Sequence, residues 1–316
     1  MTDNTMLDDD LNKGLRPVDR KRIQGVYDNT TVDRERNDVW FIHAVLAQCF
    51  LPYRDPKEHY WDRKNGDFAI SLTSGRVQNP KTDEFETVGL PYGAKPRLFQ
   101  SYICTQALRN KSPVIPVENS MSAMMQELGY KVTGGKQGSI SKFKDQITRF
   151  AACNFTIVGT TSSGTRRHVK TAPIESFDVW FSNDPKQSTL WPSEIVLTDK
   201  YYESLREHAI PYDFRGLKLI QNNARAQDIY LWMTQRLCRI PQNKPLLMTW
   251  PMLFESFGGN ETLLKRFKPE FRKALLAACT AYPEARLEEV DNGFLFKSSP
   301  PPIQKTKITV NKPVIE

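Results

Sequence analysis

The strongest constraint on the fold is an order of elements that occurs twice in the chain. Each copy predicts a helix, a short strand, a second helix, a basic amphipathic helix and a β-hairpin, and the copies lie about 130 residues apart. One copy could arise by chance, whereas the same order twice predicts two similar units. It is the order of a winged helix, a helix-turn-helix with a β-hairpin beside it. We therefore expect an α+β fold with two tandem winged-helix domains.

The basic helix of the first copy lies in Thr133–Cys153, TGGKQGSISKFKDQITRFAAC. Apolar residues recur there at helical spacing and are expected to face the core: Ile140, Phe143, Ile147 and Phe150. The opposite face is polar and basic, which by itself is more typical of the solvated side of an ordinary amphipathic helix than of a DNA-binding face. The glycines before the helix would let the backbone approach a DNA duplex, and a helix N-terminus favours a phosphate.

The residues on the two basic helices are of the types that contact DNA. Lysine and arginine neutralise phosphates, and lysine, arginine and glutamine also reach base edges in the major groove. The DNA-binding candidates of the first copy are Lys136, Gln137, Ser139, Ser141, Lys142, Gln146 and Arg149 on the helix and Arg166 and Arg167 on the hairpin. Those of the second copy are Lys265, Arg266, Lys268, Arg272 and Lys273, beside a single acid, Glu270.

The remaining elements follow from periodicity and turn residues. In the first half we expect a helix carrying Trp40, Phe41, Val45, Leu46 and Cys49, a hairpin of Asp67–Thr73 with Phe85–Val88, a helix begun by Pro96, a strand Val114–Val117, a helix capped by Asn119 or Ser120, and a hairpin of Asn154–Thr160 with Arg166–Thr171. Further on we expect strands Pro173–Phe181 and Leu190–Leu197, a helix Lys200–His208, a joint at Ile210-Pro211, a helix Gln227–Arg239, a strand Leu246–Thr249, helices Pro251–Phe257 and Leu263–Tyr282, and a hairpin of Arg286–Val290 with Phe294–Lys297. Pro269 either marks the first turn of its helix or kinks it.

These elements suggest four regions. Residues 1–33 are polar and without period, and we expect an acidic, disordered tail. Residues 34–208 form the predicted N-terminal winged-helix domain, with an added helix and hairpin before it. Residues 209–303 form the C-terminal winged-helix domain, and residues 304–316 a second tail.

Charge and composition favour a polyanionic partner. Lys and Arg number 44 against 36 Asp and Glu, which gives a formal net charge of +8. The chain opens on a polar, acidic stretch rather than a signal peptide, and no apolar run approaches the roughly 20 residues of a membrane span. We expect a cytoplasmic protein with no membrane partner. The five cysteines are scattered through apolar segments, so we expect them to be reduced and buried in the core.

The sequence offers no constellation for catalysis. The four histidines are isolated, and none belongs to a metal-ligand motif. Gly134-Gly135-Lys136 lacks the Ser or Thr of a phosphate loop and follows a helix rather than a strand. Tyr201-Tyr202 has no paired histidines of the kind that a strand-nicking enzyme uses to hold a metal. We expect no enzymatic activity, no catalytic residue, no metal and no cofactor.

Several runs of residues also resemble a known family. They are FIHAVLAQCFLP (Phe41–Pro52), LPYGAKPRL (Leu90–Leu98), the run Thr133–Cys153, PIESFDVW (Pro173–Trp180), LWPSEIVL (Leu190–Leu197), ARAQDIYLW (Ala224–Trp232), FKPEFRKAL (Phe267–Leu275) and YPEAR (Tyr282–Arg286). Together they resemble the RepA-type plasmid replication initiator family, in order, from roughly Val39 to Pro302. Pro269 departs from that pattern, because the family is expected to have a continuous helix there.

The resemblance implies an initiator that binds repeats in the double-stranded DNA of its plasmid origin. Such proteins recruit the host replication initiator and the replicative helicase, and they control copy number. Self-dimerisation is left open. A sequence-specific transcriptional repressor stays open as an alternative, as do a nicking or priming enzyme and a protein-interaction module whose charge only aids solubility.

Overall fold

A computed structural model describes residues 36–66, 68–79, 82–116, 121–135, 138–160, 165–176, 194–259 and 261–303. Several sequence predictions concern residues outside these ranges. They are the two tails at 1–33 and 304–316, the helix cap at Asn119 or Ser120, and the candidates Lys136 and Gln137.

The elements of the first part are η1 (Arg36–Asp38), β1 (Val39–His43), β2 (Tyr60–Asn65), β3 (Phe68–Thr73), β4 (Arg76–Gln78), β5 (Phe85–Thr87), α3 (Ala94–Asn110), β6 (Val114–Pro116), α4 (Met121–Glu127), α5 (Ser139–Ala152), β7 (Asn154–Thr160), β8 (Arg166–Thr171), β9 (Ile174–Ser176) and β10 (Glu194–Leu197). Those of the second part are α6 (Asp199–His208), β11 (Ala209–Asp213), α7 (Phe214–Leu219), α8 (Ala224–Arg236), η2 (Leu237–Arg239), β12 (Leu246–Thr249), α9 (Trp250–Phe257), α10 (Leu264–Ala281), β13 (Leu287–Val290) and β14 (Gly293–Phe296). The fold is therefore α+β, as the sequence predicts.

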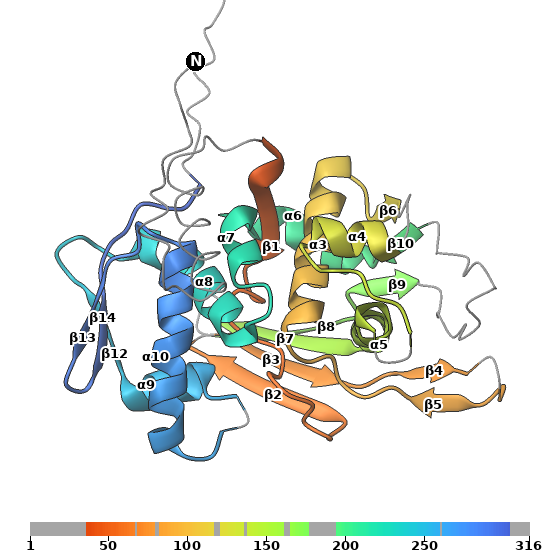
Figure 1. Ribbon diagram of the computed structural model, residues 1–316, viewed down its shortest axis with the longest axis horizontal. Coiled ribbons are helices and arrows are strands. Elements are labelled where there is room, and N and C mark those ends of the chain that lie inside the picture. The colour runs from red at the N-terminus through yellow and green to blue at the C-terminus, as the bar shows by residue number, and fades with distance from the viewer. Residues whose placement is uncertain are drawn as a thin grey trace, which may run out of the picture.

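The elements pack around one connected set of buried apolar side chains. A four-stranded antiparallel sheet of order β2-β3-β7-β8 lies along one side, with α3 and α5 on its inner face (Figure 1). Ile70, Leu72 and Phe155 project from this sheet into the core, and Phe150 of α5 packs edge-on against Phe155. On the other side α8, α9 and α10 pack together beside a three-stranded sheet of order β12-β14-β13.

A buried ion pair joins the first helices of the two repeated patterns. Arg97 of α3 and Asp228 of α8 are 3% and 2% exposed. The Arg97 guanidinium donates in a fork to both Asp228 carboxylate oxygens, Nε to Oδ1 at 2.7 Å and Nη2 to Oδ2 at 2.8 Å. Its remaining donors reach the backbone carbonyls of Leu51, Pro52 and Gly93. A buried charge pair is tolerated only with such complete hydrogen bonding.

The predicted helix around Trp40 is wrong, because residues 39–43 form strand β1. Its partner is β11, which pairs with it from Val39↔Asp213 to His43↔Ala209. The predicted joint at Ile210-Pro211 is thus also a strand. The run of β-branched and aromatic residues favours a strand, and Trp40 and Ile42 are buried at alternate positions. The apolar residues that mimic helical spacing, Val45 to Leu51, lie in the turns after β1.

The predicted hairpin of residues 67–73 with 85–88 is also wrong in its pairing. Both extended segments exist, but β5 pairs with β4, from Arg76↔Thr87 to Gln78↔Phe85. Strand β3 pairs instead with β2 and β7. The sequence analysis missed β2, whose burial alternates between exposed and half-buried residues and leaves only a weak apolar signal.

The second repeated pattern is present as predicted in the order of its elements. Helix α8 is followed by β12, α9, α10 and the hairpin β13–β14, and β12 pairs with β14. Helix α10 begins at Leu264, so Pro269 lies inside it on the exposed side. A proline there removes one helical hydrogen bond to Lys265 and leaves that carbonyl to solvent.

The first pattern has the predicted order of elements but a different sheet. Helices α3, α4 and α5 and the hairpin β7–β8 follow one another, with β6 between α3 and α4. Strand β6, however, pairs with β10 and not with the hairpin, which joins β3 and β2. The predicted domain boundary between residues 208 and 209 stays a prediction. Strand β11 lies directly after this boundary, but it pairs with β1, which belongs to the predicted N-terminal domain.

The cysteines are free, but they are not all buried. Cys49, Cys104 and Cys153 are buried, Cys279 is half-buried and Cys238 is exposed. Burial raises the pKa of the Cys49 and Cys153 thiols to about 12. The prediction of a buried thiol is therefore wrong for Cys238. This residue lies in η2, after the end of α8, and not on the apolar face of that helix.

Candidate nucleic-acid interface

Helix α5 has one buried and one exposed face, as its spacing predicts. Phe143, Ile147 and Phe150 are buried, and Ile140 is half-buried against the same core. The hydroxyl of Ser139 is used within the preceding loop: it donates to the Lys131 carbonyl at 2.8 Å and accepts from the Thr133 N–H at 2.8 Å. The first turn of α5 is thereby fixed by its own loop.

Ser141 and Lys142 are exposed on α5 and form its free polar face. A second cation, missed by the sequence analysis, is Lys95 of α3, which is near enough to Lys142 to be affected by its charge. Lys95 lies over the Tyr130 ring at 5.6 Å. Burial and the charge of Lys142 lower the pKa of Lys95. Two like charges held in proximity attract an anion. Lys95 was overlooked because it stands in a helix recognised only by its apolar residues.

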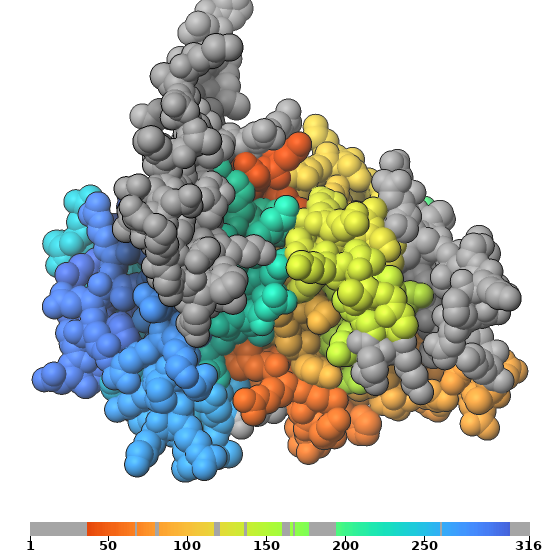
Figure 2. Space-filling model, viewed as in Figure 1, coloured from red at the N-terminus to blue at the C-terminus, as the bar shows by residue number. Residues whose placement is uncertain are grey.

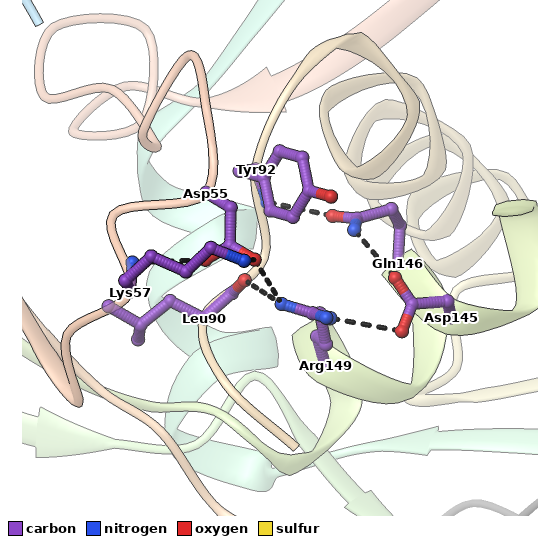
Figure 3. A network of polar contacts seen from close by, with 7 residues as sticks. All are labelled: Asp55, Lys57, Leu90, Tyr92, Asp145, Gln146 and Arg149. Carbon is purple, nitrogen blue, oxygen red and sulfur yellow. Dashed lines mark hydrogen bonds and ion pairs between the residues drawn. The ribbon is translucent and has the colours of Figure 1, made fainter. Parts of the chain in front are cut away.

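Gln146 and Arg149 occupy the side of α5 that faces another part of the chain (Figure 3). Gln146 is 5% exposed; its Oε1 accepts from the Tyr92 N–H at 2.7 Å, and its Nε2 donates to Asp145 at 2.9 Å. Arg149 pairs with Asp145 at 3.0 Å and with Asp55 at 3.5 Å, and its guanidinium lies over the Tyr92 ring at 5.3 Å. Both side chains hold α5 against its surroundings.

The carboxylate of Asp55 is ionised at this contact. Burial opposes its ionisation, but hydrogen bonds from the backbone and side chain of Lys57, with the charges of Arg149 and Lys57, lower its pKa below the usual value. The Lys57 ammonium donates to Asp55 Oδ2 at 3.1 Å. The residues drawn in Figure 3 thus form a charged clamp between α5 and residues 55–57.

Replacing Gln146 by alanine is expected to lower the free energy of unfolding by about 1–3 kcal/mol, because the partly buried Tyr92 N–H loses its acceptor. Ser141→Ala, an exposed change on the same helix, should shift it by less than about 0.5 kcal/mol. Urea unfolding of both variants measures the difference. Equal stabilities would show that Gln146 does not carry this contact.

The first hairpin presents basic residues along its outer strand. Arg166, His168 and Lys170 of β8 are exposed, at alternate positions on one face of the sheet. The side chain of the candidate Arg167 lies outside the described residues. The exposed cations belong to an edge strand, so they are accessible to a large partner.

Helix α10 carries the second set of candidates. Lys265 and Arg266 are exposed on its first turn. Lys268 and Arg272 both lie over the buried Trp250 side chain, 5.0 Å and 4.7 Å from the ring centroid. Trp250 begins α9 and was not singled out in the sequence; it supports these two cations from below.

The cations of α10 differ in how far they are already neutralised. Arg272 pairs with Glu289 of β13 at 2.6 Å, and Lys273 with Glu270 at 2.9 Å. Within the part of the chain that the structure describes, Lys265, Arg266 and Lys268 make no ion pair. The charge available to an anionic partner is therefore concentrated in the first two turns.

The two basic helices reach the same side of the molecule. In Figure 2 the blue region that contains α10 and the yellow-green region that contains α5 both lie on the face turned to the viewer. Among the described residues no group of acidic, histidine or cysteine side chains could hold a metal ion. Nor does that part of the chain contain a helix both long and apolar enough to span a bilayer.

Residues 90–251 match the family described as plasmid-encoded RepA protein, from the Leu90 turn beside Arg149 to the start of α9. The chain belongs to this family. The match covers the first basic helix, while α10 of this RepA-family chain lies beyond its end. The expected family resemblance is thereby confirmed. Membership supports a role in plasmid replication.

Other comparisons add little to the family match. A search of curated proteins finds no match to the RepA-family chain. Among solved structures, the crystal structure of domains 2 and 3 of RctB, a selenomethionine derivative, is similar at a TM-score of 0.47 and 12% identity. That similarity covers 74% of this chain and 85% of the RctB chain.

Proposed function

We propose that the chain is a cytoplasmic initiator that binds repeated sites in the double-stranded DNA of its plasmid origin. Family membership and the two basic helices on one side of the molecule support this proposal. In it the chain recruits the host replication initiator and replicative helicase, and the number of occupied repeats controls copy number. The chain itself supplies binding energy and no catalysis.

The second unit is proposed to bind as a winged helix. The observation that favours this is its sheet order, β12-β14-β13, in which the strand before the second helix pairs with the last strand of the hairpin. Helix α10 then follows α9 as the recognition helix, and Lys265, Arg266 and Lys268 project from its first turns. A helix inserted by its N-terminal half brings such side chains to phosphates and base edges.

The first unit is proposed to bind with α5, although its hairpin belongs to a larger sheet. Ser141 and Lys142 are the residues that we assign to DNA on this helix, with Lys95 beside them. The mutual repulsion of Lys95 and Lys142 supports the assignment, because a phosphate between them would relieve it. The cations Arg166 and Lys170 on the hairpin are assigned to the flanking backbone, and the predicted contact of Arg167 is kept as part of that group.

Gln146 and Arg149 receive a different role in this proposal. Their side chains orient α5 through Tyr92 and Asp55, so they would affect DNA binding only through the position of the helix. Arg272 and Lys273 already pair with acids and are assigned a smaller share of phosphate binding than the first turn of α10.

A replication assay tests the proposal and separates it from its rivals. A plasmid that carries only the origin repeats and a resistance marker should be maintained when this chain is supplied and lost when it is not. Maintenance should fail when the repeats are scrambled. A repressor would bind an operator but would not maintain the plasmid. Incubation of the chain with supercoiled origin DNA and Mg²⁺ should leave the DNA closed; a nick or a primer would overturn the non-enzymatic mechanism.

A further inference from the structure

Residues Leu51–Lys57, here called the strap, touch both repeated units. On the side of the first unit, Arg97 donates to the Leu51 and Pro52 carbonyls, and the Pro52 carbonyl also accepts from the Gly93 N–H at 2.9 Å. The far end of the strap reaches α5, where Asp55 pairs with Arg149 at 3.5 Å. The strap is therefore fixed against the helix that we assign to DNA in the first unit.

The strap also contacts the second unit, through Tyr53. The Tyr53 ring contacts the guanidinium groups of Arg97 of α3 and Arg225 of α8, whose Cζ atoms are 5.2 Å and 5.0 Å from its centroid. It also packs on the α9–α10 loop, where a Cβ atom on Gly259 would lie 2.4 Å from Tyr53 Cδ2. Gly259 has φ +63°, so this close approach requires a residue without a side chain. Tyr53 thus joins the strap to the entry of α10.

Two exposed cations project from the strap between these anchors. Lys57 is exposed and lies beside the Asp55–Arg149 pair. Arg54 is exposed and, among the described residues, makes no hydrogen bond or ion pair. Its charge nevertheless reaches α10. The pKa of Glu270 lies below its usual value because Lys273 hydrogen-bonds to it, and the charges of Lys273, Arg225 and Arg54 act in the same direction.

Arg54 lies between Tyr53, which packs on the α9–α10 loop, and Asp55, which is bound to α5. A segment so placed lies between the two helices on the side proposed to face DNA.

We propose that the strap is a third DNA contact, in which Arg54 binds the phosphate backbone of the duplex between the two basic helices. This inference rests on the proposed function and extends it to a site that neither repeated unit contains. Because Tyr53 and Asp55 are held by the two units, Arg54 is presented on a rigid segment. It would contact the sugar–phosphate backbone between the two major-groove sites, and it would do so on any sequence.

Replacing Arg54 by alanine is expected to weaken binding to an origin repeat roughly eightfold at 0.1 M salt. The slope of log K against log salt should fall by about 0.9, the value for one lost phosphate contact. Hydroxyl-radical footprinting should lose its protection between the two helix-protected patches and keep the patches themselves. Arg54→Lys should retain most of the affinity, because a lysine still neutralises a phosphate.

Arg239→Ala is the matched control. It removes the same charge from η2, beyond the far end of α8, and a helix of this length holds that end about 20 Å from Arg225. This variant should bind like the wild type. An Arg54→Ala protein with wild-type affinity, salt slope and footprint would overturn the inference and leave the strap a structural tie.

The same measurements on random duplex DNA separate this inference from the proposed function. A phosphate contact is independent of sequence, so Arg54→Ala should lower the salt slope on random duplex as well. Suppose that Arg54→Ala lowers the salt slope but the wild-type chain shows no preference for origin repeats. This result would support the strap contact and would contradict only the proposed initiator function.

Discussion

Arg97→Ala is expected to lower the free energy of unfolding by about 3–5 kcal/mol, the cost of leaving a buried charge without its partner. Asp228 is 2% exposed, and both of its oxygens are bound by the Arg97 guanidinium. The change also removes the donors to the Leu51, Pro52 and Gly93 carbonyls. Urea denaturation of the folded chain measures the loss.

Two further variants serve as controls for the Arg97→Ala measurement. Lys297→Ala breaks an exposed ion pair with Glu288 and should leave the unfolding midpoint unchanged. The double change Arg97→Met with Asp228→Leu removes both charges and should recover much of the lost stability, because an apolar pair needs no charge compensation. A single Arg97→Ala change as mild as Lys297→Ala would contradict the role assigned to this pair.

The ion pair matters for function because of what it joins. Arg97 lies on the first helix of one repeated pattern and Asp228 on the first helix of the other. The two units are therefore fixed in register by a specific polar contact and not by apolar packing alone. A fixed separation of the basic helices would favour repeats of one spacing, in which both helices meet their grooves together.

The second large effect is expected at the first turns of α10. Changing Lys265, Arg266 and Lys268 to alanine together should lower the slope of log K against log salt by about 2.7, from three phosphate contacts of about 0.9 each. At 0.1 M salt the affinity for an origin repeat should then fall by about two to three orders of magnitude. Filter binding or anisotropy over a salt series measures both quantities.

The control for this triple variant removes the same charge elsewhere. Lys200, Arg206 and Arg239 are exposed on α6 and η2, away from the two basic helices. Their joint replacement by alanine should leave the salt slope close to that of the wild type. An equal fall in both triple variants would show that net charge, and not the surface of α10, determines binding.

Local patterns in the sequence predict much of this fold. The apolar spacing of α5 and α10 identifies their buried faces, and the predicted hairpin of residues 286–290 with 294–297 is present as β13 and β14, with Asp291 and Asn292 in its turn. Pro96 was correctly expected in the first turn of α3. These features depend on residues within one or two turns of each other, so a single sequence contains them.

Contacts between distant segments are what the sequence does not predict. Strand β1 finds its partner β11 only through tertiary packing, and the apolar residues after it, Val45 to Leu51, extend its pattern into a spacing that mimics a helix. The spacing of residues along α5 does not show which polar side chains are exposed and which are buried, because Gln146 and Lys142 are both typical of an exposed surface. Only the approach of Tyr92 and Asp55 buries one and leaves the other free.

We propose that the two basic helices of one chain bind a single origin repeat, and hydroxyl-radical footprinting of the chain on one repeat tests this proposal. We expect two protected patches centred about 10 base pairs apart, one helical turn of DNA, on one face of the duplex. Lys142→Ala should weaken one patch, and the triple variant of α10 the other. A single patch, or equal protection of a scrambled sequence at physiological salt, would contradict the account.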